Sequence, residues 1–182
     1  MLTPARRRGV EILDDPGVDP AVRERSIGDV TRSNRWLGGL RAGMLGVRDA
    51  SDAFGDAYTL LDVGTGLADI PDTLRRNARR LGKTVTAIGV DEAPSLLASA
   101  RGRLEFVVAA NALALPFRDH SIDVVICSQL LHHFEWPDAE RLLTEMNRVA
   151  RRAVVVSDLR RSWLAAAGFP ARASMSVIWK AI

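Results

Sequence analysis

Runs of apolar and β-branched residues alternate with amphipathic stretches along most of this chain. The short apolar runs predict strands at 58–63, 84–90, 105–109, 122–128 and 153–157. Apolar residues at helical spacing predict helices at 69–82, 94–102 and 137–150, with a loop at 110–120. Strands that alternate with helices in this way imply right-handed crossovers and a parallel sheet. The pattern therefore predicts an α/β fold that is Rossmann-like and doubly wound, with a mostly parallel sheet.

The N-terminal part of the chain departs from this alternation. Residues 21–46 have the periodicity of one or two amphipathic helices, and residues 47–57 predict a polar linker. We therefore expect an N-terminal helical extension over 1–57 and the Rossmann-like domain over 58–182.

The boundary between the first strand and the next helix carries the first chemical signal. The strand stops at Gly64 and Gly66, and a helical pattern begins near Asp69. Such a boundary is expected to present unpaired backbone N–H groups, and glycine lets a ligand approach the main chain closely. Asp62 lies inside this strand, where a carboxylate favours a cationic ligand over a phosphate. The pattern therefore argues against a plain dinucleotide fingerprint.

A second acidic residue supports a nucleoside-type cofactor. Asp91 follows the second predicted strand, where an acid can accept hydrogen bonds from ribose hydroxyls. Nicotinamide enzymes place an acid at the same point, so Asp91 alone does not separate the two cofactors. The alternative is that Asp62 is a turn-forming acid and Asp91 caps a helix.

Composition limits the class of protein. At 182 residues with 47% hydrophobic content, the chain can bury one good core. It has no run of 18 apolar residues, and the arginines near Met1 precede no apolar stretch, so we expect neither a membrane span nor a secretory signal. A single cysteine, Cys127, excludes an internal disulfide and fits a reducing cytoplasm.

The charge pattern argues against a nucleic-acid partner. The net charge is +3, and nearly all of the positive charge is arginine because the only lysines are Lys83 and Lys180. Together with heavy use of alanine, this indicates a GC-rich coding bias rather than a nucleic-acid surface. The basic clusters are scattered and lack interleaved aromatic residues, so they do not form a nucleic-acid surface.

Four motifs in this order resemble those of the class I S-adenosylmethionine-dependent methyltransferases, in the group that acts on small molecules. The matching segments are 61–66, 89–91, 111–117 and 121–134, and the resemblance runs from about Leu60 to Asp158. It implies a seven-stranded type of sheet, S-adenosylmethionine as cofactor and a small-molecule acceptor. It implies no metal.

The resemblance also assigns roles to residues at the strand ends. Asp62 would lie near the methionyl amine, and the turn of Gly64, Thr65 and Gly66 would contact the methionine and ribose. Asp91, with Glu92 beside it, would hold the ribose hydroxyls.

The adenine end would be bound by the third motif. Asn111 stands where the family usually has an aspartate that accepts a bond from the adenine amino group, and the amide offers one neutral acceptor in its place. Ala112 and Leu113 would pack beside the purine ring, and Ser128 ends the fourth strand at the same edge. Ala68 replaces a frequent third glycine with another small residue.

A polar segment before the domain resembles the lead-in helix that folds over the cofactor in some bacterial members. A guanidinium of Arg32 or Arg35 would pair with the methionyl carboxylate, and Asn34 would add a hydrogen bond. The alternative is an exposed helix face that ends in a glycine cap.

The acceptor side is less defined, and we expect methylation of oxygen. A hydroxyl nucleophile must lose its proton, and a histidine is suited to take it. His133 is the first candidate for this general base, and His132 is the second. The alternative is that this pair only shapes the pocket. C- or N-methylation, a nicotinamide-dependent oxidoreductase and a cofactor-binding protein without catalysis remain open, as does assembly into a homodimer.

We expect the C-terminal part to be shortened relative to the family pattern. Residues 159–170 provide about one short helix, and residues 171–182 suffice for one strand or a tight hairpin. We favour the interpretation that a stretch near 165–168 is missing from the sequence, over the absence of an acceptor-side cover.

Overall fold

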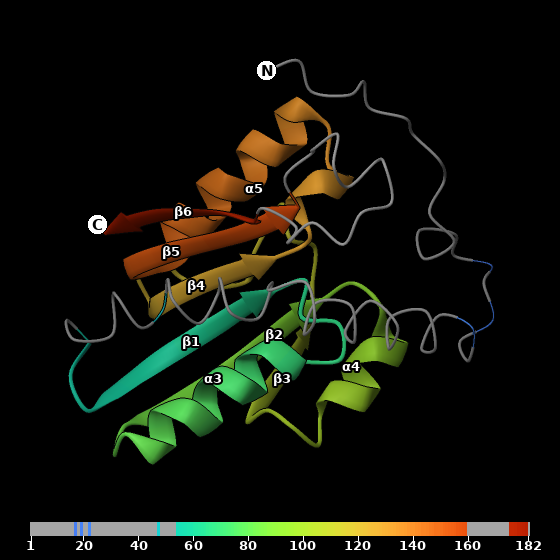
Figure 1. The fold of residues 1–182 in the computed structure, drawn as a ribbon. Coiled ribbons are helices and arrows are strands. Elements are labelled where there is room, and N and C mark those ends of the chain that lie inside the picture. The colour runs from blue at the N-terminus through green and yellow to red at the C-terminus, as the bar shows by residue number, and fades with distance from the viewer. Residues whose placement is uncertain are drawn as a thin grey trace, which may run out of the picture.

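The computed structural model describes residues 17, 19, 22, 47, 54–159 and 175–181. Within them, six strands form one sheet in the order β3-β2-β1-β4-β5-β6 (Figure 1). The strands are β1 Ala57–Val63, β2 Thr84–Asp91, β3 Phe106–Ala109, β4 Ile122–Ser128, β5 Ala150–Leu159 and β6 Met175–Ala181. The first five are parallel, and β6 pairs antiparallel with β5. The predicted Rossmann-like, mostly parallel architecture is confirmed.

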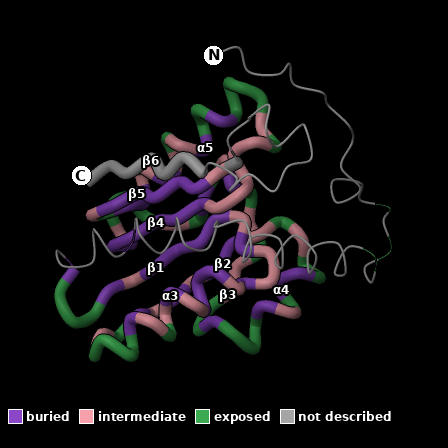
Figure 2. The backbone as a smooth tube through the Cα atoms, viewed as in Figure 1, coloured by how far each residue is buried: buried purple, intermediate pink, exposed green. Residues whose placement is uncertain are grey.

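The helices cover the two faces of this sheet. The described helices are α3 Asp69–Arg80, α4 Pro94–Ala100, the short 3-10 helix η3 Leu131–His133 and α5 Trp136–Val149. Leu60 of β1 is buried in one cluster with Leu74 of α3, whereas the next residue, Leu61, is buried in another with Leu142 of α5. Because successive strand residues point to opposite faces, α3 and α5 lie on opposite sides of the sheet. The buried residues concentrate along the central strands (Figure 2).

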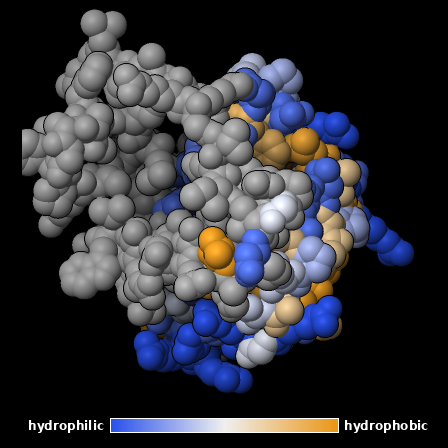
Figure 3. Space-filling view, turned by 90° about the vertical axis from the view of Figure 1, so that its right-hand side faces the viewer, coloured by the Kyte–Doolittle hydropathy of each residue, from blue (hydrophilic) through white to orange (hydrophobic). Residues whose placement is uncertain are grey.

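The central strand β1 marks the point where the strand order reverses. Asp62 is paired in register with Gly89 of β2 on one side and with Ile126 of β4 on the other. In open α/β sheets, ligands bind outside the carboxyl ends of the strands at this switch point. These ends point to the right in Figure 1, and Figure 3 turns that side to the viewer. On the surface formed by the described residues, which Figure 3 draws in colour, hydrophobic residues lie between hydrophilic ones.

The element boundaries differ from the predicted ones at several ends. The fifth strand runs from Ala150 to Leu159, longer than the predicted 153–157, because its pairing with β4 begins at Ala150. The connection between β3 and β4 contains no helix, as predicted for 110–120. Among the described residues of the C-terminal segment, Met175–Ala181 form the strand β6, which agrees with one of the two predicted options.

The polar-linker prediction for 47–57 is wrong at two residues. Val47 and Phe54 are each only 3% exposed and belong to the core cluster of Tyr58. The rings of Phe54 and Tyr58 lie 5.3 Å apart between centroids. The apolar side chains of this stretch therefore extend the core beneath β1. None of the helices that the structure describes is long and apolar enough to cross a membrane.

Candidate active site

The turn after β1 is tied to the neighbouring strand β2. The backbone N–H groups of Gly64 and Thr65 both donate to the carbonyl of Val90, each at 2.9 Å. Gly64 has φ of 74°, a left-handed conformation that glycine adopts without steric cost. A Cβ atom at Gly64 would lie 2.8 Å from the Leu130 side chain, so the turn also packs against the segment after β4.

The backbone N–H groups of the turn were predicted to be unpaired, but the structure shows hydrogen bonds for four of them. The N–H of Gly66 donates to Asp91 and that of Ala68 donates to the Thr65 carbonyl, in addition to the two bonds to Val90. The prediction of unpaired N–H groups is therefore wrong for these four residues, because β2 and the turn itself supply acceptors. This leaves the turn poorly suited to cradle a phosphate through these amides.

Ala68 ends the turn in a strained conformation. It has φ of 60°, which costs an L-residue about 1–2 kcal/mol relative to glycine. Its side chain is fully buried in one cluster with Ala87, Ala100 and Leu104, so the methyl group fills the space between α3, β2 and α4. This packing opposes the cost of the backbone conformation.

Asp62 is a buried carboxyl group that has one side-chain donor among the residues that the structure describes. It is 2% exposed, and the hydroxyl of Thr65 donates to Oδ2 at 2.9 Å. Burial raises the pKa of Asp62 to about 8, the nearby charges of Asp69 and Asp91 raise it further, and the Thr65 bond opposes them. A cationic group placed beside it would favour the ionised form. Asp62 is therefore suited to bind an ammonium group.

Gly89 creates the space that Thr65 needs. A Cβ atom at Gly89 would lie 2.7 Å from the Thr65 methyl carbon, 2.9 Å from its hydroxyl and 2.8 Å from Leu104. A glycine at this point of β2 therefore allows the Thr65 hydroxyl to reach Asp62. The sequence motif contained Gly89, and the structure adds this reason for it.

Asp91 connects the turn to the start of α4. Its Oδ2 accepts the N–H of Gly66 at 3.0 Å, and its Oδ1 accepts the N–H of Ala93 at 2.9 Å. A carboxylate can accept about four hydrogen bonds in all, so both oxygens retain capacity for hydroxyl donors. Glu92, the next residue, is exposed. The structure thus orients Asp91 at the carboxyl end of β2.

The predicted adenine segment forms a tight turn after β3. The Asn111 Oδ1 accepts the N–H of Leu113 at 2.7 Å, and the Asn111 carbonyl accepts the N–H of Ala114 at 3.0 Å. Ala112 is buried in the core cluster of β1 and α5, and Asn111 is exposed. The side-chain oxygen expected to face a ligand is thus partly used within the turn, with one lone pair remaining.

The end of β4 presents an unpartnered hydroxyl. The Ser128 Oγ is buried and has no hydrogen-bond partner among the residues that the structure describes. Buried hydroxyl groups are normally paired, so this one is ready to bind a ligand or water. The following residue, Gln129, has φ of 56° and turns the chain toward η3.

A histidine and an aspartate pair across the ends of β4 and β5. The Nδ1 of His132 lies 2.7 Å from Oδ1 of Asp158, and the His132 N–H donates to Oδ2 at 2.8 Å. The ring of His132 stacks on that of His133, with centroids 4.2 Å apart. His133 is exposed. The carboxylate of Asp158 therefore fixes both the main chain and the ring of His132.

Sequence reasoning did not identify Asp158. The available signal was its position at the carboxyl end of the fifth predicted strand, the rule by which Asp91 was found. Arg32, Asn34 and Arg35, predicted to contact the cofactor, lie outside the described residues. The remaining predicted residues lie at or just after the carboxyl ends of β1, β2, β3 and β4.

Comparisons with known proteins agree with this geometry. A family model described as a methyltransferase domain matches residues 61–156, more than half of the chain. No curated protein matches.

Solved structures with the same fold are distant in sequence. They include a magnesium protoporphyrin IX methyltransferase from Synechocystis with bound S-adenosylhomocysteine (14% identity, 86% of this chain and 67% of that one, TM-score 0.58). Others are S-adenosylmethionine-dependent methyltransferases from Aquifex aeolicus (20%, 79% and 74%, 0.55) and Thermotoga maritima (22%, 78% and 62%, 0.51). The chain thus spans less than two thirds of the Thermotoga protein. At these identities the likeness supports the fold.

Proposed function

Because the chain belongs to the methyltransferase domain family, we propose that it transfers the methyl group of S-adenosylmethionine to a hydroxyl oxygen of a small molecule. The pairing of His132 with Asp158 beside the predicted cofactor site is the observation that carries the choice of oxygen. A hydroxyl must lose its proton as it is methylated, and this pair is suited to take that proton.

The described residues fit S-adenosylmethionine. Asp62 offers a buried carboxyl to the methionyl ammonium, Asp91 offers acceptors to the ribose hydroxyls, and the unpartnered Ser128 Oγ offers a donor or acceptor at the same edge. The amides of the glycine turn are already paired, which agrees with a ligand that lacks phosphates. When bound, this cofactor supplies a methyl group activated by its sulfonium.

The tautomer of His132 follows from its partner. A carboxylate only accepts hydrogen bonds, so the Nδ1 of His132 must carry the hydrogen that it shares with Asp158. In that tautomer of the neutral ring, Nε2 carries no hydrogen, so it is the nitrogen that can accept a proton. Asp158 also stabilises the imidazolium that forms when Nε2 takes a proton.

The transfer itself requires alignment and one proton acceptor. Nε2 of His132 would take the hydroxyl proton as the acceptor oxygen is methylated, and the bound cofactor would supply the methyl group and retain the electron pair of the broken carbon–sulfur bond. Holding the two reactants in line can lower the barrier by roughly 7–11 kcal/mol. The products are a methyl ether, S-adenosylhomocysteine and a proton on His132, which then passes to solvent.

Calorimetric titration tests the cofactor. We expect S-adenosylmethionine and S-adenosylhomocysteine to bind and NAD not to bind. Binding of NAD alone would overturn the proposal in favour of an oxidoreductase, and binding of none of the three would indicate a domain without this function.

The acceptor class is tested next with labelled methyl donor. We expect label in small phenols and alcohols. Transfer to amines or carbon acids only would overturn the assignment to oxygen while leaving methyl transfer intact.

A further inference from the structure

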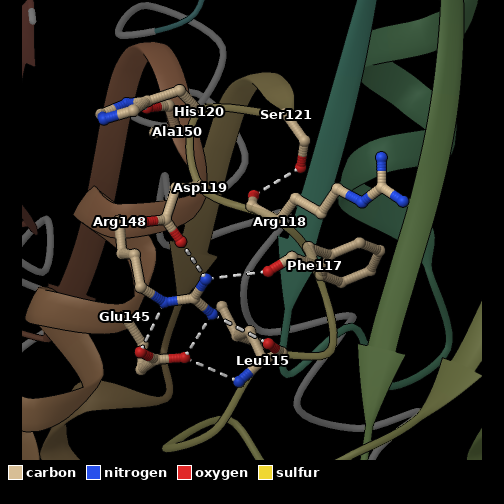
Figure 4. A network of polar contacts seen from close by, with 9 residues as sticks. All are labelled: Leu115, Phe117, Arg118, Asp119, His120, Ser121, Glu145, Arg148 and Ala150. Atoms are coloured by element: carbon tan, nitrogen blue, oxygen red, sulfur yellow. Dashed lines mark hydrogen bonds and ion pairs between the residues drawn. The ribbon is translucent and has the colours of Figure 1, made fainter.

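Two charged residues of α5 hold the backbone of the loop between β3 and β4 (Figure 4). Glu145 Oε2 accepts the N–H of Leu115 at 2.9 Å, and Arg148 Nη2 donates to the Leu115 carbonyl at 2.9 Å. Arg148 Nη1 donates to the Phe117 carbonyl at 2.8 Å. Arg148 and Glu145 also bond each other through Nε and Nη2, each at 2.8 Å.

This ion pair gives Leu115 the backbone hydrogen bonds that a residue in a sheet receives from a neighbouring strand. Leu115 lies in the connection from β3 to β4, away from any ladder, and it is 4% exposed. Backbone groups buried without partners cost free energy. The pair satisfies the N–H and C=O of the same residue, which fixes the position of Leu115 against α5.

The clamped residue lies directly after the predicted adenine segment. The turn of Asn111 is closed by the N–H groups of Leu113 and Ala114, and Leu115 follows without a spacer. Ala112 and Leu115 are both buried in the cluster that contains Met146 of α5. The turn is therefore anchored by packing at Ala112 and by hydrogen bonds at Leu115.

We propose that Arg148 and Glu145 are positioning residues that hold the loop wall of the adenosyl subsite. This inference rests on the proposed function, since it takes the turn at Asn111 to contact the adenine. Neither residue touches the cofactor. They act by keeping residues 111–115 in one conformation, so that binding does not require ordering of this segment.

The ion pairs of this cluster do not by themselves explain its geometry. Arg148 also pairs with Asp119 at 2.7 Å, but the Asp119 side chain is 67% exposed, and such pairs contribute little. What is specific to Arg148 is its planar fork, whose Nη atoms reach two backbone carbonyls of the loop. A lysine at this position keeps the charge but cannot bridge both carbonyls and Glu145.

The variant Arg148→Lys tests the inference by titration with S-adenosylhomocysteine and with adenosine, which probes only the adenosyl end. We expect both dissociation constants to rise by about tenfold, which corresponds to about 1.4 kcal/mol. In turnover assays we expect KM for S-adenosylmethionine to rise in parallel, with kcat and the acceptor KM within about twofold of wild type.

The matched control is Arg75→Lys. The Arg75 guanidinium bridges Asp72 and Glu105 at 3.1 and 2.6 Å, and its side chain is 29% exposed, against 30% for Arg148. It ties α3 to the residue before β3, at the amino end of the sheet. We expect this variant to be less stable than wild type but to bind S-adenosylhomocysteine and adenosine with unchanged affinity.

The outcomes separate the two claims. Unchanged affinities in Arg148→Lys, or equal weakening in Arg75→Lys, would overturn the positioning role. If Arg148→Lys does not fold, Glu145→Gln is measured in its place with the same expectation. Wild-type protein that binds neither compound would overturn the proposed function and this inference with it.

Discussion

Asp62 combines deep burial with one side-chain hydrogen bond from the described part of the chain, and this has a consequence for stability. Its folded-state pKa is raised to about 8 from an ordinary value of 3.8, mainly because burial disfavours the charge. Between these values the folded chain binds more protons at this site than the unfolded chain. The free energy of unfolding should therefore fall as pH rises through this window, by up to about 1.4 kcal/mol per pH unit, and stay lower above it.

The variant Asp62→Asn removes this titration. We expect the ligand-free variant to lose the downward slope in stability from pH 5 to pH 8, and to be more stable than wild type at pH 8.5. Urea unfolding at four pH values measures both. Identical slopes in the two proteins would show that Asp62 is already ionised in the folded state.

The His132–Asp158 pair predicts that the two adjacent histidines contribute unequally to catalysis. We expect His132→Ala to lower kcat/KM by about 10²–10⁴-fold, the usual contribution of a general base, while S-adenosylhomocysteine affinity stays within about twofold. Asp158→Asn should lower the rate in the same direction, because the amide no longer fixes the tautomer.

The matched control for the base is His133→Ala. His133 is exposed and stacks on His132, so its removal should cost much less activity. A larger loss in His133→Ala than in His132→Ala would reverse the assignment and restore the order expected from the sequence.

At the scale of residues, the sequence could identify candidate site residues that lie at or next to the carboxyl end of a single predicted strand. Asp62, Asp91 and Asn111 were predicted in this way, although their roles toward a cofactor remain predictions. Asp158 was missed because its partner His132 is 26 residues away, and only the pairing of β4 with β5 brings them together. The state of the turn amides was mispredicted for a related reason, since the acceptors of three of the four amides belong to β2.

At the scale of elements, the end of α3 offers a test of backbone geometry. Gly82 follows the helix with φ of 76°, and a Cβ atom there would meet nothing within 4 Å. Gly102 has the same open space without a left-handed φ. We expect Gly82→Ala to destabilise by about 1–2 kcal/mol and Gly102→Ala to be neutral or stabilising by up to about 1 kcal/mol.

Thermal or urea unfolding of these two variants measures the difference. Because neither added methyl group meets another atom, crowding cannot explain a loss of stability. Equal effects in the two variants would mean that the conformation of Gly82 adapts to alanine at no cost.

Elements were predictable where periodicity was strong, and their ends were not. The strand at 153–157 was predicted too short because Ala150 pairs with Ile122 of β4, which no local pattern shows. The burial of Phe54 was missed because it is an isolated aromatic residue between Asp52 and Asp56, and only the packing of Tyr58 against it reveals a core position.

At the scale of the whole molecule, a ligand that binds only the folded chain should stabilise all of it. At a concentration 100 times its dissociation constant, S-adenosylhomocysteine should add about 2.7 kcal/mol and raise the melting temperature by roughly 5–10 °C. NAD at the same concentration should leave the melting temperature unchanged. Differential scanning fluorimetry measures both, and a shift with NAD alone would contradict the cofactor assignment.

The reversal of strand order at β1 also predicts the order in which the strands associate during folding. Thr59 bonds Asp123 across 64 residues of sequence, whereas β1, β2 and β3 are joined by shorter connections. Nearby segments meet sooner than distant ones, so we expect β1–β3 to associate before β4 docks. Asp62 and Asp91 belong to the early half, and His132 and Asp158 to the late half. A nascent chain would thus gain the means to hold its methyl donor before it gains the means to use it.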